Sequence, residues 1–175
     1  MLLGFAILGA IDDWMGLNAS RQAEGLKPRT KFLLQILIAL GTAFVLKYWL
    51  HAPEMFLPNV EEEIELGVWY IPMAVFIIVA TSNATNLTDG LDGLAGLITA
   101  TAFVAYGIVA MLQGQVFLVR FCFTMVGAIF AFLWYNVHPA ELFMGDTGSL
   151  ALGAVLGVVA LMTGQWILLP VIAII

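Results

Sequence analysis

Residues 94–112 read LAGLITATAFVAYGIVAML, a run without a single charged side chain. At a rise of about 1.5 Å per residue, a helix of this length spans about 30 Å, which is the thickness of the hydrocarbon core of a bilayer. Comparable runs lie on both sides of it along the chain. Because a charge in the middle of a membrane helix is costly, these runs predict membrane-spanning helices.

The composition excludes the other broad classes of protein. Of the 175 residues, 62% are hydrophobic and 10% are charged, with a mean hydropathy of +1.03. A soluble domain carries about 25% charged residues, and a disordered chain is polar. Strands of a membrane β-barrel alternate polar and apolar residues, which these runs do not. We therefore expect an all-α polytopic integral membrane protein, with residues 1–175 forming a single membrane domain.

Seven apolar runs locate the expected spans and predict about six to seven transmembrane helices. The first and the last run are each shorter than a full span, so both ends of the chain look truncated and the sequence resembles a fragment of a longer protein. The runs cover residues 1–11, 32–50, 68–83, 94–112, 116–135, 150–162 and 166 onward.

The distribution of basic residues orients these spans. Four of the six lysines and arginines lie between the first two runs, so residues 12–31 are expected on the cytoplasmic side. Residues 51–67 contain five glutamates and no lysine or arginine, and are expected outside, with a small hairpin among them. Alternation then places residues 84–93 and 136–149 on the cytoplasmic side as well.

Five aspartates from three separate loops fall on this cytoplasmic side, namely Asp12, Asp13, Asp89, Asp92 and Asp146. Carboxylates in such numbers repel one another unless a cation lies among them. The first two end an apolar run, where an acidic side chain opposes the helix dipole. The pattern therefore predicts a convergent site that holds something positive.

Residues 83–93 read NATNLTDGLDG and place Asn83, Asn86, Asp89 and Asp92 at every third position. On helical turns these side chains would share roughly one face. Oxygen-rich clusters of this kind suit a hard cation such as Mg²⁺, which is often shared with substrate phosphates. Capping and turn formation are the alternative interpretation.

Two further segments carry polar groups. Asp146 lies between Gly145 and Gly148 at the start of a span, where Thr147 and Ser149 are expected to cap the helix. The basic residues at 27–31 either bind a phosphorylated ligand or serve only as a topology signal. A GxxxG pair, Gly153 and Gly157, is expected to serve helix packing.

Four segments together resemble the polyprenyl-phosphate N-acetylhexosamine-1-phosphate transferase superfamily, and within it the muramoyl-pentapeptide branch. They are IDDW at 11–14, GLKPRTKFLLQ at 25–35, SNATNLTDGLDGLAG at 82–96 and FMGDTGSLALG at 143–153. The resemblance implies ten spans, of which this chain would supply the third through part of the ninth. The family's histidine-rich last cytoplasmic loop is not in this sequence, so we expect the 175 residues alone to be inactive.

The resemblance also implies a reaction. Phospho-MurNAc-pentapeptide would pass from UDP-MurNAc-pentapeptide to undecaprenyl phosphate, giving lipid I and UMP, with Mg²⁺ required. The site would lie at the cytoplasmic face of the bacterial inner membrane, in contact with the lipid bilayer, and a homodimer is left open. Nucleic acid is not expected as a partner, because no basic patch is large enough to neutralise its backbone.

Residue roles follow from the same resemblance. Asp146 is implied as the Mg²⁺ ligand, and Asp12 as the base or lipid-phosphate activator, with Asp13 beside it. Asp89, together with Asn83 and Asn86, is implied to line the catalytic centre, and Lys31 to assist phosphate binding. The positions implied around the uridine are Gly90, Leu91, Asp92 and Asn136.

Three other functions stay open from the residues alone. The related N-acetylglucosamine-1-phosphate transferases share the overall pattern. A transporter or ion pathway also uses acidic groups in membranes, although here they lie at span ends rather than in the middle of spans. A purely structural membrane subunit would leave the five aspartates unexplained.

Overall fold

The computed structural model describes residues 1–18, 25–53, 55–56 and 64–173, and this part of the chain is helical without strands. Short π and 3₁₀ turns at Val45–Trp49, Gly67–Trp69 and Trp166–Leu168 continue or precede the α-helices. The hairpin expected within residues 51–67 falls largely on residues outside the described ranges. The α-helices are α1 (Leu2–Asn18), α2 (Pro28–Phe44), α3 (Tyr70–Thr88), α4 (Leu94–Leu112), α5 (Val116–Asn136), α6 (Gly145–Met162) and α7 (Leu169–Ala173).

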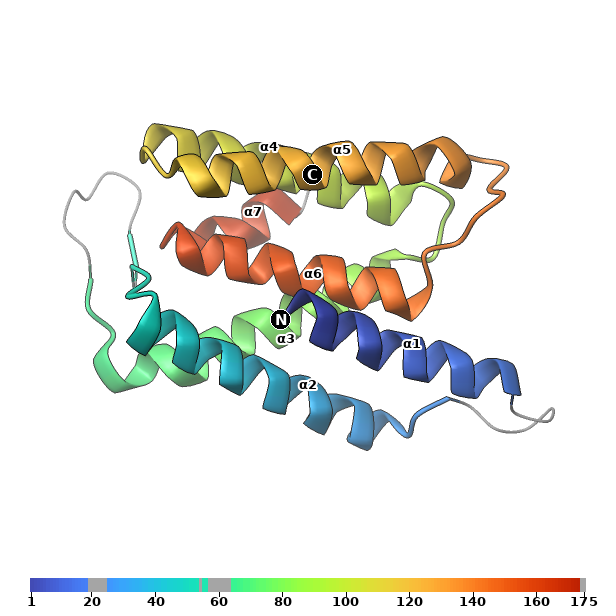
Figure 1. Ribbon diagram of the computed structural model, residues 1–175, viewed down its shortest axis with the longest axis horizontal. Helices are drawn as coiled ribbons and strands as arrows, with labels where there is room; N and C mark the ends of the chain where they lie inside the picture. Colours follow the sequence, from blue (N-terminus) through green and yellow to red (C-terminus); the bar gives the residue numbers. More distant parts are fainter. Residues whose placement is uncertain (19–24, 54, 57–63, 174–175) are drawn as a thin grey trace.

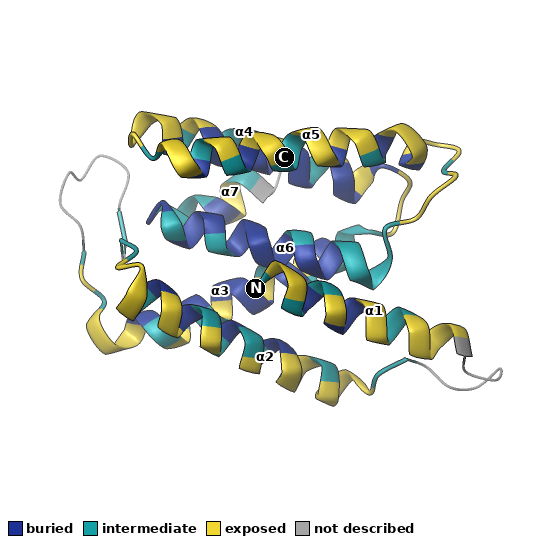
Figure 2. Cartoon of the chain, in the orientation of Figure 1, coloured by how far each residue is buried: buried dark blue, intermediate teal, exposed yellow. Residues whose placement is uncertain are grey.

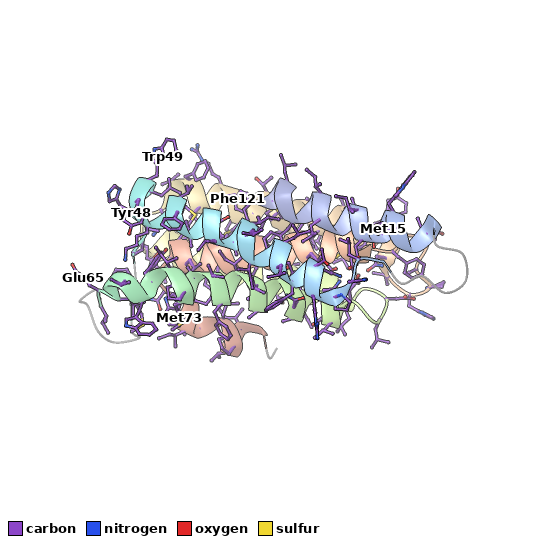
Figure 3. All side chains as sticks on the ribbon, turned by 90° about the horizontal axis from the view of Figure 1, so that it is seen from below. Met15, Tyr48, Trp49, Glu65, Met73 and Phe121 are labelled. Carbon is purple, nitrogen blue, oxygen red and sulfur yellow. The ribbon has the colours of Figure 1, made fainter. Side chains whose placement is uncertain are left out.

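Five of these helices, α2 to α6, are long and apolar enough to cross a membrane once the flanking turns are included. This confirms the predicted polytopic membrane fold. Large apolar side chains such as Leu33, Phe76 and Trp134 are exposed. Figure 2 shows exposed residues along the outer helices of the bundle, where lipid would cover them. The exposed Tyr48 and Trp49 lie with Glu65 at the end of the bundle opposite Met15 (Figure 3), as expected of an interfacial aromatic belt.

Helix α6 is the most deeply buried helix and lies between the layer of α4 and α5 and the layer of α1, α2 and α3 (Figures 1 and 2). A Cβ atom at Gly153 would lie 2.4 Å from the Thr81 carbonyl oxygen, and one at Gly157 would lie 2.5 Å from Thr81 Oγ1. Ser82 Oγ donates to the Leu150 carbonyl oxygen at 2.9 Å. The expected packing role of the GxxxG pair is thus confirmed, and these contacts fix the position of α6 along α3.

The helices run alternately up and down. The ends of α1, α3 and α5 and the starts of α2, α4 and α6 therefore meet at one end of the bundle, on the right of Figure 1. This end carries the predicted cytoplasmic segments. The convergence expected from charge bias is therefore present in the fold.

Four helices extend beyond their predicted apolar runs at the end where the aspartates converge, and one of them is α2, which begins at Pro28 rather than at residue 32. Helix α1 continues to Asn18, so Asp12 and Asp13 lie inside it rather than at its end. Helix α3 continues to Thr88 and includes Asn83 and Asn86. Hydropathy marks where the apolar environment ends, whereas a helix continues into the polar region for as long as its backbone stays hydrogen-bonded.

The last difference concerns the start of α6. The helix begins at Gly145, so Thr147 and Ser149 lie within its first turns and neither side chain caps it. Ser149 Oγ donates instead to the Gly145 carbonyl oxygen at 2.8 Å. The cap comes from another helix, as described below.

The predicted sidedness can be tested with single cysteines at exposed positions. Gly90→Cys lies in the α3–α4 connection and Glu141→Cys in the α5–α6 connection, both at the end of the bundle where the aspartates converge. Leu112→Cys lies at the opposite end of α4. We expect a membrane-impermeant maleimide to label the first two only from the cytoplasmic side and the third only from outside. The native Cys122 is buried and gives little background. Labelling of Gly90→Cys and Glu141→Cys from opposite sides would contradict the fold.

Candidate active site

An ion-paired lysine lies among the aspartates. Lys31, in the first turn of α2, donates through Nζ to Asp12 Oδ2 at 2.9 Å and also to Asp146 Oδ2. The side chains of Lys31, Asp12 and Asp146 are 18%, 15% and 23% exposed, so the pairing is sheltered from water. A cation expected from the clustered carboxylates is therefore present, and α1, α2 and α6 each contribute one member.

The second aspartate of α1 caps α6. Asp13 Oδ1 accepts from the Asp146 backbone N–H at 3.2 Å, and Oδ2 accepts from the Thr147 N–H at 3.0 Å and from Thr147 Oγ1 at 2.7 Å. A carboxylate at this position accepts hydrogen bonds from the free N–H groups at the start of the helix and interacts favourably with the positive end of the helix dipole. Asp13 thereby fixes the backbone that carries Asp146.

Two glycines allow this close approach. A Cβ atom at Gly9 would lie 2.3 Å from the Asp146 carbonyl oxygen, so the backbones of α1 and α6 touch one turn before Asp13. Gly145 has φ of +61°, and a Cβ atom there would lie 2.9 Å from Asp13 Oδ2. Both positions therefore exclude larger residues for a geometric reason.

Helix α3 supplies the other partner of Asp146. Asn86 Nδ2 donates to Asp146 Oδ1 at 2.6 Å and to Ser149 Oγ at 2.9 Å. Asp89 follows at the end of the same helix, where burial and then the charges of Asp146 and Asp13 raise the pKa of its carboxyl. Asp89 thus lies within electrostatic reach of the cluster.

Asn83 faces a different neighbour. Its amide exchanges hydrogen bonds with Gln35 of α2, at 2.7 Å from Asn83 Nδ2 to Gln35 Oε1 and 3.4 Å in the reverse direction. Gln35 is 1% exposed. Sequence reasoning missed it, although an amide within the apolar run 32–50 was a usable signal.

A cavity of about 650 Å³ opens beside Lys31. It lies where the segment leading into α2, the first turns of α2, and residues of α1 and α3 meet. Two basic side chains line it, and the Leu26 backbone N–H at its wall donates to Asp12 Oδ1 at 2.6 Å. Its lining residues are Asp12, Gly25, Leu26, Pro28, Arg29, Lys31, Phe32, Gln35 and Asn83.

A second cluster joins two loops. Asp92 Oδ2 lies 3.0 Å from His138 Nδ1 and accepts from the Ala140 N–H at 3.2 Å. The hydrogen bond with His138, followed by that with Ala140, lowers the pKa of the Asp92 carboxyl. The buried Asn136 accepts from the Gly93 N–H at 3.0 Å and donates to the Leu142 carbonyl oxygen at 2.8 Å. Gly90 and Leu91 are exposed beside this cluster.

The expectation that residues 83, 86, 89 and 92 share roughly one helical face holds only in part. A step of three residues falls short of a full helical turn, so successive side chains rotate by about 60° around the axis. Asn83 accordingly meets α2, whereas Asn86 meets α6. Asp92 lies beyond the helix, in the loop before α4.

The donor chemistry suits a divalent cation that also contacts its substrate. Among the residues that the structure describes, no three His, Cys, Asp or Glu side chains form a complete metal site. Mg²⁺ in phosphate-transfer sites is usually held by one or two carboxylates together with substrate phosphates and water. Asp146, with Asp89 and Asn86 close by, fits that requirement. The carboxylates of Asp12, Asp13, Asp89 and Asp146 also outnumber the single Lys31 ammonium that pairs with two of them.

Comparison with curated proteins shows extensive similarity. The chain is 49% identical to a phospho-N-acetylmuramoyl-pentapeptide-transferase of Chloroflexus aurantiacus, over 100% of this chain and 50% of that protein. It is 44% identical to the protein of that name from Wolbachia sp. subsp. Drosophila simulans, over 99% of this chain and 53% of that protein. A Geobacillus protein of the same name is 42% identical over 97% of this chain and 52% of its own length.

The chain thus spans about half the length of the curated relatives it matches. A comparison with protein families gives the same grouping, since residues 1–164 match glycosyl transferase family 4. These residues include all four segments on which the resemblance rests. This match over most of the chain shows that the chain belongs to glycosyl transferase family 4.

Proposed function

We propose that this protein transfers phospho-MurNAc-pentapeptide from UDP-MurNAc-pentapeptide to undecaprenyl phosphate, giving lipid I and UMP, at the cytoplasmic face of a bacterial inner membrane. The observation that carries the proposal is the cluster of Asp12, Lys31 and Asp146 at one end of a membrane bundle, beside a cavity with a second basic residue. A soluble nucleotide and a membrane-held lipid phosphate can meet only at such a boundary. The names of the relatives support this substrate pair.

The reaction exchanges one phosphate bond for another. An oxygen of the lipid phosphate forms a bond to the phosphorus that carries the sugar, and the bond from that phosphorus to the bridging oxygen breaks, so that UMP leaves with this oxygen. Two anionic substrates must be brought together, so neutralisation and alignment dominate the catalysis. Arg29 and Lys31 would attract the lipid phosphate into the cavity that they line.

Asp12 is suited to take the proton of the lipid phosphate. Its carboxylate accepts from the Leu26 N–H and from Lys31, which keeps it oriented and ionised. Asp13 would hold Asp146 in place through the α6 backbone. When bound, Mg²⁺ would be held by Asp146 with Asp89 and Asn86 nearby, and would neutralise charge on the diphosphate.

The uridine is proposed to lie by the second cluster, near Gly90, Leu91, Asp92 and Asn136. His138 Nδ1 and the Ala140 N–H both contact Oδ2 of the Asp92 carboxylate. Its other oxygen could then accept from the imide N–H of uracil. Asn136, whose amide bonds the backbone of both loops, would position them rather than read the base.

The direct test is release of UMP from the full-length protein in detergent, rather than from residues 1–175 alone, with Mg²⁺, UDP-MurNAc-pentapeptide and undecaprenyl phosphate. We expect release that depends on all three additions. UDP-N-acetylglucosamine replaces the donor in a parallel reaction. Release only with that sugar would move the protein to the N-acetylglucosamine branch, and no release with either donor would reject the proposal.

A further prediction separates the two carboxylates of the α3–α4 connection. Asp92→Ala is expected to raise KM for the UDP-sugar by about ten- to hundredfold, because a hydrogen bond to a charged group contributes about 1.5–3 kcal/mol. Asp89→Ala is expected to lower kcat instead, because Asp89 lies close to Asp146. Steady-state kinetics with UDP-sugar and Mg²⁺ titrated separately measure both effects.

The matched control is Glu141→Ala, which removes an exposed carboxylate from the facing loop. It should leave both constants near their original values. If Asp89→Ala and Asp92→Ala change the same constant to the same extent, the proposed division between reacting phosphates and nucleotide is wrong.

A further inference from the structure

Lys31 is part of both the carboxylate cluster and the neighbouring cavity. Its ammonium pairs with Asp12 and Asp146 inside the carboxylate cluster, and its side chain also lines the 650 Å³ cavity together with Arg29. A lysine carries a compact charge on a flexible four-carbon stem, so it can reorient between neighbouring anions. The same ammonium can therefore serve either the carboxylates or an anion in the cavity.

Asp146 has both of its oxygens engaged. Asn86 donates to Oδ1, and Lys31 donates to Oδ2. A divalent cation bound through Oδ2 would have to compete with the ammonium, and two cations at one carboxylate oxygen repel each other. Lys31 therefore opposes metal binding in the arrangement that the structure describes.

Building on the proposed function, we propose that Lys31 couples the two ligands of the site. A phosphate monoester bound in the cavity draws the Lys31 ammonium off Asp146, which frees Oδ2 for a divalent cation. Without the anion, Lys31 stays on the carboxylates and the metal binds weakly. By linkage, the metal must strengthen binding of the phosphate by the same factor.

The first measurement uses the unaltered protein. Mn²⁺ replaces Mg²⁺ as a spectroscopic probe, and free Mn²⁺ is followed by electron paramagnetic resonance during titration of the intact protein in detergent. We expect farnesyl monophosphate to tighten Mn²⁺ binding by about tenfold, within the 5- to 150-fold range usual for coupled sites. Association of Mn²⁺ with the phosphate alone is measured without protein and subtracted.

Inorganic phosphate forms the second arm of that titration. Coupling with both anions supports the proposal with the phosphate group as the recognised part. Coupling with farnesyl monophosphate alone supports it with the prenyl chain needed to seat the anion. Independent binding of Mn²⁺ in both arms would overturn the proposal.

Direct contact between metal and phosphate would also couple the two ligands. Substitution of Lys31 distinguishes such contact from coupling through the Lys31 ammonium. Lys31→Met should tighten Mn²⁺ binding about tenfold in the absence of phosphate and abolish the further gain on adding it. Lys31→Arg retains the charge and should retain the coupling. Coupling that stays unchanged in Lys31→Met would show that the two ligands touch directly, and that Lys31 has no part in it.

Two controls complete the design. Lys27→Met removes the same charge from an exposed side chain that does not line the cavity, and should leave the coupling intact. Should Lys31→Met fail to fold, Lys31→Gln keeps a hydrogen-bond donor without the charge and must show the same loss. The titrations contain no UDP-sugar, so an active transferase with independent Mn²⁺ binding would refute this inference while leaving the proposed function intact.

Discussion

Asp146→Asn is expected to reduce Mg²⁺-dependent turnover by about two to four orders of magnitude. A metal ion that neutralises transferring phosphates contributes several kcal/mol to the transition state, and each 1.4 kcal/mol is about tenfold in rate. Asparagine keeps the size of the side chain and an oxygen that can accept from Asn86. It loses the charge that would hold the metal, so the defect should lie in turnover rather than in folding.

The measurement is UMP release across a range of Mg²⁺ concentrations, together with expression level and thermal stability. Glu141→Gln is the matched control, because it neutralises an exposed carboxylate a few residues earlier, in the connection between α5 and α6. Its turnover should match that of the unaltered protein. Turnover of Asp146→Asn within a few-fold of normal would remove Asp146 from the role of metal ligand.

The membrane fold could be predicted because lipid imposes a simple rule. Uncharged runs of span length such as residues 94–112 have few alternatives to a transmembrane helix. The up-and-down order of α2 to α6 then follows from counting spans. The basic residues near Lys31 indicated which end of the bundle would carry the converging aspartates.

Hydropathy could not predict which aspartate meets which partner. Asp12 and Asp13 are adjacent in the sequence, yet a helix turns them about 100° apart. Asp12 accordingly faces Lys31, whereas Asp13 faces the start of α6. The difference depends on how α1 is rotated against α6, which is set by packing at Gly9. No local pattern encodes that rotation.

The roles of two buried amide side chains could not be predicted from the sequence either. Asn136 was predicted around the uridine by resemblance, and the structure has its amide bonded to the backbone of two loops. Gln35 was not singled out at all. Asn136 links two loops and Gln35 links α2 to α3, both in a low-dielectric interior where an unpaired amide would be expensive. Such roles become visible only when the partner segments are placed in space.

The close contact at Gly9 gives the second large expected effect. Gly9→Ala would place a methyl group 2.3 Å from the Asp146 carbonyl oxygen and 2.5 Å from the Thr147 nitrogen. These are backbone atoms, so α1 and α6 must move apart, at a cost of about 1–3 kcal/mol for overpacking. The movement loosens the cap that Asp13 places on α6 and shifts Asp146, and a displacement of about 1 Å can cost about 100-fold in rate.

Gly16→Ala is a matched control in the same helix. A Cβ atom there meets nothing within 4 Å, and alanine favours a helix over glycine by about 1 kcal/mol. We therefore expect Gly16→Ala to keep full turnover with equal or higher thermal stability, while Gly9→Ala loses turnover even in the fraction that stays folded. UMP release per folded protein, with folding followed by thermal melting, distinguishes the two variants. Full specific activity in Gly9→Ala would show that α1 does not set the position of Asp146, and Asp13 would then lose its proposed positioning role.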